Sequence, residues 1–212
     1  MDSEFFSSFI AGAGRALVAL LLLINPSAAS EWFRGGDPVA GEASFQQVCF
    51  ACHGTGGAAS ITPDIPLLAG QHAGYLVKQL LDYKNGRRND PQMSALVANM
   101  QEQDFANMAA FLAAQPLAKS GEEPAPAAQM GERIFHEGPA NGEIPACREC
   151  HGLDARGVPQ EFPSLKGQSS VYLAKQLQAF RSGERNDPIM AAVAAGLTEE
   201  EITAVAAYLA SL

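Results

Sequence analysis

Two short stretches of the chain carry residues whose types and spacing could do chemistry. Cys49-Phe50-Ala51-Cys52-His53 occurs a second time as Cys147-Arg148-Glu149-Cys150-His151. Two thiols at positions i and i+3 lie on one face of a helical turn, where they can reach the two vinyl groups of one porphyrin. The histidine that follows can donate a ring nitrogen to the iron. Cys-x-x-Cys-His is the attachment signature of c-type haem, so each stretch, called a haem motif below, predicts one covalently bound haem c.

Other chemistries fit these residues less well. All four cysteines of the chain lie in the two haem motifs. A structural zinc site usually needs four ligands from two knuckles, whereas each motif offers three and the motifs lie about a hundred residues apart. A thioredoxin-like redox pair would need a strand and a helix around it and no histidine. A disulfide within each cysteine pair is the remaining alternative.

The sixth ligand of a histidine-bound iron decides between electron transfer and other chemistry. Methionine is a soft donor that favours ferrous haem and raises the reduction potential. Met93 follows His53 and Met190 follows His151 at nearly the same separation, each within Asn-Asp-Pro-x-Met. Ordinary core packing is the alternative role. The paired placement after a proline turn favours iron ligation, which leaves no open position for a substrate.

The remaining histidines and methionines lack this repetition. His72 and His136 could give bis-histidine ligation, but neither recurs in the other half, so we expect them on the solvated surface. Met100 is the main rival of Met93; it aligns with Leu197 and is expected to pack in the last helix of its half.

Two further pairs of residues recur near the haem motifs. Pro66 follows His53 and Pro163 follows His151, again at nearly the same separation. Their backbone carbonyls could accept a hydrogen bond from the histidine ring, which orients such ligands, or the prolines could simply end a loop. Arg88 and Arg185 precede the methionine segments and could either neutralise haem propionates or lie on the surface.

The elements that position these residues are helical and occur twice. Apolar spacing predicts helices over residues 41–48, 75–83 and 104–112, and Thr198 with Glu201 predicts a capping box for the last helix. The second half also carries an insertion of eight residues before its haem motif. The expected fold is all-α, with two tandem domains over residues 30–115 and 130–212 and an extended, solvated, proline- and alanine-rich linker over residues 116–129.

The N-terminal segment, residues 1–29, indicates an address outside the cytoplasm. Arg15 precedes an apolar run from Ala16 to Ile24, and small residues lead to a cleavage site after Ala29. The run is too short for a membrane span, although an uncleaved anchor is the alternative because acidic residues precede Arg15. Covalent haem is attached outside the cytoplasm, so a periplasmic location is expected. The formal net charge of -9 argues against nucleic-acid binding.

The ordered, duplicated set of motifs resembles the dihaem cytochromes c of the cytochrome c4 type. The resemblance extends from about residue 41 to residue 212 and includes the Gly-Gln loops and the Tyr-Leu-x-Lys-Gln-Leu segments. It implies two class I cytochrome c folds packed face to face about a pseudo-twofold, with their haem propionate edges close together. It also implies a periplasmic carrier, often loosely associated with a membrane, that delivers electrons to terminal oxidases.

Three functions are therefore considered. The main expectation is an electron carrier with two His/Met-ligated haems that exchanges electrons with a membrane oxidase or a bc1-type complex. The alternative is the dihaem subunit of a periplasmic dehydrogenase such as a flavocytochrome sulfide dehydrogenase. A dihaem peroxidase or thiosulfate dehydrogenase would require an iron with an exchangeable position, and the repeated methionines argue against it.

Overall fold

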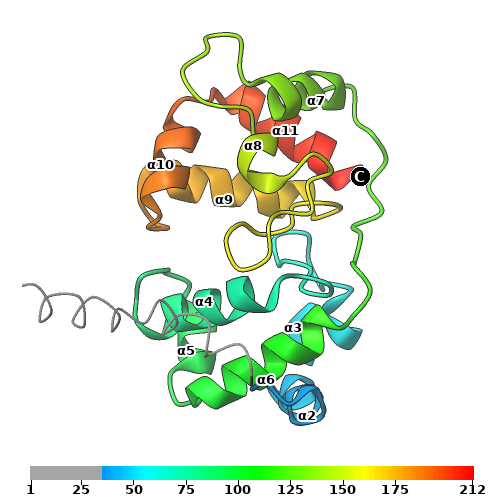
Figure 1. Cartoon of the computed structure of the whole chain (residues 1–212), viewed down its shortest axis with the longest axis vertical. Coiled ribbons are helices and arrows are strands. Elements are labelled where there is room, and N and C mark those ends of the chain that lie inside the picture. Colours follow the sequence, from blue (N-terminus) through cyan, green and yellow to red (C-terminus); the bar gives the residue numbers. More distant parts are fainter. Residues whose placement is uncertain (1–34) are drawn as a thin grey trace, which may run out of the picture.

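The computed structural model describes residues 35–212, which form helices joined by loops (Figure 1). The expected signal segment, residues 1–29, lies outside the described residues, and its cleavage stays a prediction. Residues 35–212 contain no strand, only isolated bridges that join Arg88 to Arg185 and Val158 to Phe162. In the same part of the chain no helix is long and apolar enough to span a bilayer.

The first domain is built around the packing of its first helix on its last one. Its elements are α2 (Pro38–Val48), α3 (Phe50–His53), the 3₁₀ helix η1 (Thr55–Gly57), α4 (Ala73–Lys84), α5 (Pro91–Val97) and α6 (Glu102–Ala113). Helix α2 crosses α6, and α4 also packs on α6. The core between them includes Phe45 and Phe105, both fully buried.

The second domain repeats this arrangement. Its elements are α7 (Ala128–Glu137), α8 (Arg148–His151), α9 (Ser170–Ser182), α10 (Pro188–Ala195) and α11 (Glu199–Ala210). Helix α7 crosses α11, and the fully buried Phe135 and Ile202 occupy the places of Phe45 and Phe105. The predicted capping box is confirmed, since Thr198 and Glu201 satisfy each other's backbone N–H groups at the start of α11.

A glycine permits each of the two helix crossings. A Cβ atom at Gly41 in α2 would lie closer than 3.0 Å to the backbone carbonyl of Asn107 in α6. A Cβ atom at Gly131 in α7 would meet the carbonyl of Ala204 in α11 in the same way. Backbone atoms cannot yield to such contacts as a flexible side chain can, so only glycine allows the helices to approach this closely.

The two domains meet through α4, α9 and the loops that follow the haem motifs. Helices α4 and α9 lie on facing sides of the boundary, and the loops over residues 58–72 and 152–169 come together between the domains (Figure 1). The hydrogen bonds across the boundary come in equivalent pairs, as a pseudo-twofold requires. Gln71 of the first domain bonds to Ser164, and its counterpart Gln168 bonds to Leu67.

The linker is mostly exposed, as expected of a solvated segment, but it is also hydrogen-bonded to both domains, which the sequence did not indicate. The Ala118 N–H donates to the Ala69 carbonyl at 3.3 Å, and the Ser120 N–H donates to the Gly167 carbonyl at 2.7 Å. The side chain of Ala118 is buried. An extended backbone has unpaired N–H groups, and the loop carbonyls of the two domains satisfy two of them here. Helix α7 already begins at Ala128, so the last linker residues are helical.

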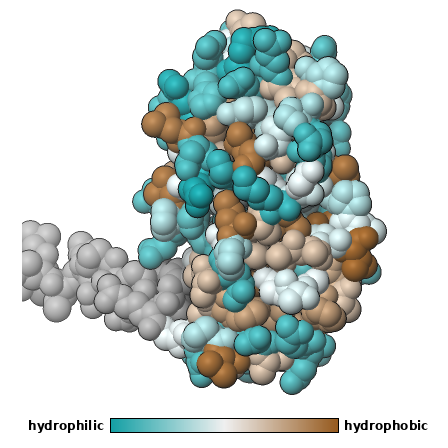
Figure 2. Space-filling view, turned by 90° about the vertical axis from the view of Figure 1, so that its right-hand side faces the viewer, coloured by the Kyte–Doolittle hydropathy of each residue, from teal (hydrophilic) through white to brown (hydrophobic). Residues whose placement is uncertain are grey.

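The insertion of the second domain forms the loop between α7 and α8. Ile144 anchors this loop, because its side chain packs on the core of the second domain. It also lies so close to Gly196 that a Cβ atom there would be 2.6 Å from Ile144 Cγ2. On the face that Figure 2 shows, hydrophobic residues are interspersed with hydrophilic ones rather than gathered in a single belt.

Candidate functional site: two equivalent haem-binding sites

Each haem motif forms a single helical turn. The N–H of His53 donates to the carbonyl of Cys49 at 3.0 Å, and that of His151 donates to the carbonyl of Cys147 at 2.9 Å. This geometry places the thiols at i and i+3 on one side of the turn. The residue after each histidine is a glycine with positive φ, 67° at Gly54 and 77° in the second motif. Glycine adopts this conformation freely and ends the turn directly after the ligand.

The cysteines are available as thiols for covalent attachment. All four are free of disulfides. Burial raises the pKa of Cys49 and of Cys147 to about 11, so both side chains are protonated at neutral pH. Within residues 35–212 no group of three or more histidine, cysteine or acidic side chains converges as a metal cluster. Two thiols and one imidazole on a single turn fit the attachment of haem c.

The ring of each motif histidine is held by a backbone carbonyl. Nδ1 of His53 lies 2.9 Å from the Pro66 carbonyl oxygen, and Nδ1 of His151 lies 3.1 Å from that of Pro163. A carbonyl only accepts, so Nδ1 carries the proton and Nε2 keeps its lone pair for a metal. The hypothesis that these prolines supply orienting carbonyls is confirmed.

The environment of both histidines favours the neutral ring that ligation needs. Each side chain is buried, with 6% of its surface exposed. Desolvation by burial lowers the pKa of His53 and of His151, against a smaller opposing effect of the carbonyl hydrogen bond. Both imidazoles are therefore neutral at pH 7, and Nε2 is a competent ligand for iron.

The Asn-Asp-Pro-x-Met segments are helix starts rather than free-standing proline turns. Asp90 caps α5, and its Oδ1 accepts from the N–H of Met93 at 3.0 Å; Asp187 caps α10, and its Oδ1 accepts from the N–H of Met190 at 3.1 Å. A proline occupies the first helical position of each, where its missing N–H costs nothing. Both methionines therefore lie in a fixed first turn and are half-buried. Their ligation of iron stays a prediction.

The unrepeated histidines are half-buried rather than solvated. Nε2 of His72 lies 2.8 Å from the Arg156 carbonyl oxygen across the domain boundary, and Nε2 of His136 lies 3.0 Å from the Tyr208 hydroxyl. Met100 also differs from its expectation. It lies before the start of α6 rather than within that helix, and its partly buried side chain packs against the core of the first domain.

Arg88 and Arg185 are buried at the domain boundary, which corrects the surface alternative. They keep only 7% and 8% of their surfaces exposed. Each guanidinium also lies over an aromatic ring of its own domain, Tyr83 at 4.6 Å and Phe180 at 4.4 Å from the ring centres. Both guanidiniums donate to the side-chain oxygens of Gln79 and Gln176, one from each domain, at 2.8 Å. Each also donates to a tyrosine hydroxyl of the other domain: Arg88 to Tyr172 at 2.9 Å and Arg185 to Tyr75 at 2.8 Å.

The two guanidiniums lack an anionic partner in the described part of the chain. Among residues 35–212, no carboxylate lies within 4.0 Å of either group. Two buried like charges with only neutral acceptors would be stabilised by a negatively charged group nearby. The carboxylates of haem propionates have the chemistry that this pair requires, so the residues present fit the group that the haem motifs imply.

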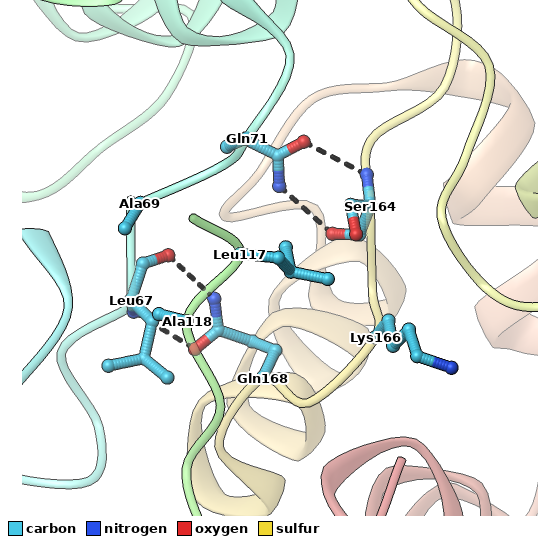
Figure 3. A pocket seen from close by; sticks show the side chains of 8 residues that line it. All are labelled: Leu67, Ala69, Gln71, Leu117, Ala118, Ser164, Lys166 and Gln168. Atoms are coloured by element: carbon cyan, nitrogen blue, oxygen red, sulfur yellow. Dashed lines mark hydrogen bonds between the residues drawn. The ribbon is translucent and has the colours of Figure 1, made fainter. Parts of the chain in front are cut away.

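Gln71 and Gln168 are functional candidates to which the sequence assigned no role (Figure 3). The side-chain amide of Gln71 donates to the Ser164 carbonyl and accepts from the Ser164 N–H, both at 2.9 Å. Gln168 makes the same two bonds to Leu67, at 2.9 and 3.0 Å. Their repetition after Leu-x-Gly in both halves was the available signal, but no local pattern reveals a partner in the other domain.

Comparison with known proteins assigns both domains to cytochromes. The family model "Cytochrome c" matches residues 128–212, and the model "Cytochrome C oxidase, cbb3-type, subunit III" matches residues 36–112. Cytochrome c4 of Pseudomonas aeruginosa is 38% identical over 203 residues, which cover 93% of this chain and 98% of that protein.

Two further comparisons extend over most of the chain. The thiosulfate dehydrogenase electron acceptor of Stutzerimonas stutzeri is 37% identical over 206 residues, 92% of each chain. The crystal structure of reduced recombinant cytochrome c4 from Pseudomonas stutzeri superposes with a TM-score of 0.78 at 36% identity, covering 84% of this chain and all of that one.

Proposed function

The chain belongs to the cytochrome c4 family, and we propose that it carries electrons in the periplasm through two His/Met-ligated haems, towards a terminal oxidase. It has two tandem class I cytochrome c domains related by a pseudo-twofold, with two covalently bound haem c groups, and it is an electron-transfer protein rather than an enzyme. The ligands, the location and the destination of the electrons are the proposal.

The residues of each domain have complementary roles in holding a haem. Cys49 and Cys52, with Cys147 and Cys150 in the second domain, are the attachment thiols. His53 and His151 would bind the iron through Nε2, and Met93 and Met190 would bind it through their thioether sulfurs. When bound, haem supplies a one-electron ferric/ferrous couple, and methionine ligation favours its ferrous state.

One observation carries the assignment: both domains present the same neutral, oriented imidazole. The Nδ1 hydrogen bonds of 2.9 and 3.1 Å fix the two rings in equivalent positions. The N-caps at Asp90 and Asp187 fix two equivalent methionines. Preserving one donor set twice suits a carrier in which both irons are six-coordinate and exchange only electrons.

A potentiometric titration followed by optical spectra tests the carrier function. We expect two haems per chain and methionine-to-iron charge-transfer absorption from both in the oxidised protein. If only one haem shows that band and the other binds cyanide or peroxide, the carrier assignment fails. Cell fractionation tests the location, with haem-bearing protein expected in the periplasmic fraction.

A second candidate is service as the electron acceptor of a periplasmic dehydrogenase. The observation that favours it is the 37% identity to the thiosulfate dehydrogenase electron acceptor of Stutzerimonas stutzeri over 92% of both chains. The test is whether a thiosulfate dehydrogenase or a flavoprotein dehydrogenase co-purifies with this chain and reduces it on addition of its substrate. Reduction by a quinol-oxidising complex but by no dehydrogenase would favour the first candidate.

A further inference from the structure

We propose that each domain positions the axial histidine of the other domain, through a glutamine that holds the peptide group to which that histidine is hydrogen-bonded. Gln168 would act on His53, and Gln71 would act on His151. The inference rests on the proposed role of the two histidines as iron ligands. Both glutamines are positioning residues, because they touch the histidines only through a backbone peptide.

The link to His53 runs through a single peptide plane. His53 Nδ1 donates to the carbonyl of Pro66 at 2.9 Å, and the N–H of Leu67 donates to Oε1 of Gln168 at 3.0 Å. The Pro66 carbonyl and the Leu67 N–H belong to the same peptide group, which is planar and rigid. Gln168 therefore holds one end of this group while His53 holds the other. Its Nε2 also donates to the Leu67 carbonyl at 2.9 Å.

The link to His151 is equivalent. His151 Nδ1 donates to the carbonyl of Pro163 at 3.1 Å, and the Ser164 N–H donates to Oε1 of Gln71 at 2.9 Å. Gln71, Gln168 and Ser164 are all buried, each with 7% of its surface exposed. The space around the two amides amounts to about 10 Å³, at the lower limit for one water molecule. The contacts seen in Figure 3 are accordingly direct and shielded from solvent.

The arrangement predicts how the glutamines affect the irons. A hydrogen-bond acceptor on the N–H side of a peptide polarises its carbonyl and makes it a stronger acceptor, because hydrogen bonds in a chain reinforce one another. A stronger acceptor at Nδ1 makes the imidazole a better donor to iron, and a better donor favours the ferric state. Loss of Gln168 should therefore raise the reduction potential of the haem in the first domain, although Gln168 belongs to the second.

The experiment uses the full-length holoprotein with Gln168→Met and, separately, Gln71→Met. Methionine keeps the length of glutamine and removes its two hydrogen bonds to the other domain. It also removes the bond that Oε1 accepts from the N–H of the next residue, Ser169 or His72. Both midpoint potentials are measured by potentiometry, with each haem assigned by NMR in partly reduced samples. We expect Gln168→Met to increase the ferrous-to-ferric ratio of the His53 haem about two- to tenfold at fixed potential, the range that one hydrogen bond allows. Gln71→Met should do this to the His151 haem.

The matched controls loosen the same boundary without touching either peptide group. His72→Ala removes the bond to the Arg156 carbonyl, and Ser169→Ala removes the 2.5 Å bond to the Pro63 carbonyl. In both controls the ferrous-to-ferric ratio of each haem at fixed potential should stay within a factor of two of its native value. Gln168→Glu keeps an oxygen that accepts from the Leu67 N–H, so it should not raise the potential of the His53 haem. This variant tests the proposal if Gln168→Met folds poorly.

Exchange of the histidine Nδ1 proton gives an independent readout. It should become faster for His53 in Gln168→Met and for His151 in Gln71→Met. A shift confined to the haem of the mutated domain, an equal shift of both haems, or no shift would each overturn the proposal. Failure of the proposed function would appear differently, as a native protein that lacks two histidine-ligated haems before any glutamine is changed.

Discussion

Arg88 and Arg185 face each other across the domain boundary in an antiparallel bridge, although they belong to different domains and carry the same charge. The pairing is tolerated because each guanidinium donates to Gln79 and Gln176 from both sides. The acceptors are neutral, so the two domains are joined by hydrogen bonds and not by ion pairs at this point. The same pair leaves net positive charge at the boundary, where the haem propionates are expected.

Replacing Arg88 by methionine should weaken the association of the two domains. The change leaves the Gln79, Gln176 and Tyr172 oxygens short of a buried donor, and we expect a loss of ~2–4 kcal/mol in the free energy of unfolding. Chemical denaturation followed by circular dichroism measures it. Arg88→Lys should retain only part of the stability, because one ammonium cannot reach all three acceptors in the fork geometry of guanidinium. An unchanged unfolding curve in the methionine variant would contradict this assignment.

Removing either predicted methionine ligand should change one haem and spare the other. Met93→Ala and Met190→Ala should each lower a single midpoint potential, because the thioether that favours the ferrous state is lost. Covalent haem content, measured by the pyridine haemochrome spectrum, should stay at two per chain. The methionine-to-iron charge-transfer band should fall to about half in either variant. Met100→Ala is the control and should leave the charge-transfer band and both potentials unchanged. If Met100→Ala weakens the band and Met93→Ala does not, the ligand assignment is wrong.

Adding a methyl group at a helix crossing should destabilise its domain. Gly41→Ala places Cβ against the Asn107 carbonyl, and Gly131→Ala places it against the Ala204 carbonyl. Because backbone must move, we expect a loss of about 3 kcal/mol or more in the free energy of unfolding. Thermal denaturation monitored by circular dichroism measures the change. Gly35→Ala is the control, since a Cβ atom there meets no atom of residues 35–212 within 4 Å. Equal stability of all three variants would refute the close approach.

Acid should weaken one exposed contact between the domains. The Thr62 hydroxyl and, next, Lys175 lower the pKa of Asp64, whose Oδ2 lies 3.1 Å from Lys175 Nζ across the boundary. A lowered pKa in the folded protein means that the contact stabilises it above the ordinary carboxylate pKa and that this stabilisation is lost as the pH falls through the lowered value. Asp64→Asn should therefore reduce the melting temperature slightly at pH 6, and the reduction should shrink as the pH falls below the ordinary carboxylate pKa.

Salt provides the check on that contact. The pair is exposed, so its contribution is small and is screened at high ionic strength. The difference in melting temperature between the native protein and Asp64→Asn should shrink when the salt concentration is raised at pH 6. A difference that persists unchanged at pH 2.5 would show that the asparagine acts through packing rather than through charge.

The sequence by itself determined the chemistry of this protein and its duplication. Cys-x-x-Cys-His indicates its chemistry within five residues, because all three reactive groups act from one helical turn. Apolar spacing predicted the helices, and repetition singled out Met93, Met190, Pro66 and Pro163, since each recurs at nearly the same distance from the motif of its own half.

Only the tertiary structure decided what happens between the domains. Gln71, Gln168, Arg88 and Arg185 find their partners eighty-four to a hundred and ten positions away in the sequence, and no local periodicity encodes a contact at that separation. For the same reason the sequence predicted a solvated linker and left open whether the two arginines neutralise propionates or lie on the surface. The physical reason is that burial of a polar group depends on what packs over it, and here the covering surface belongs to the other domain.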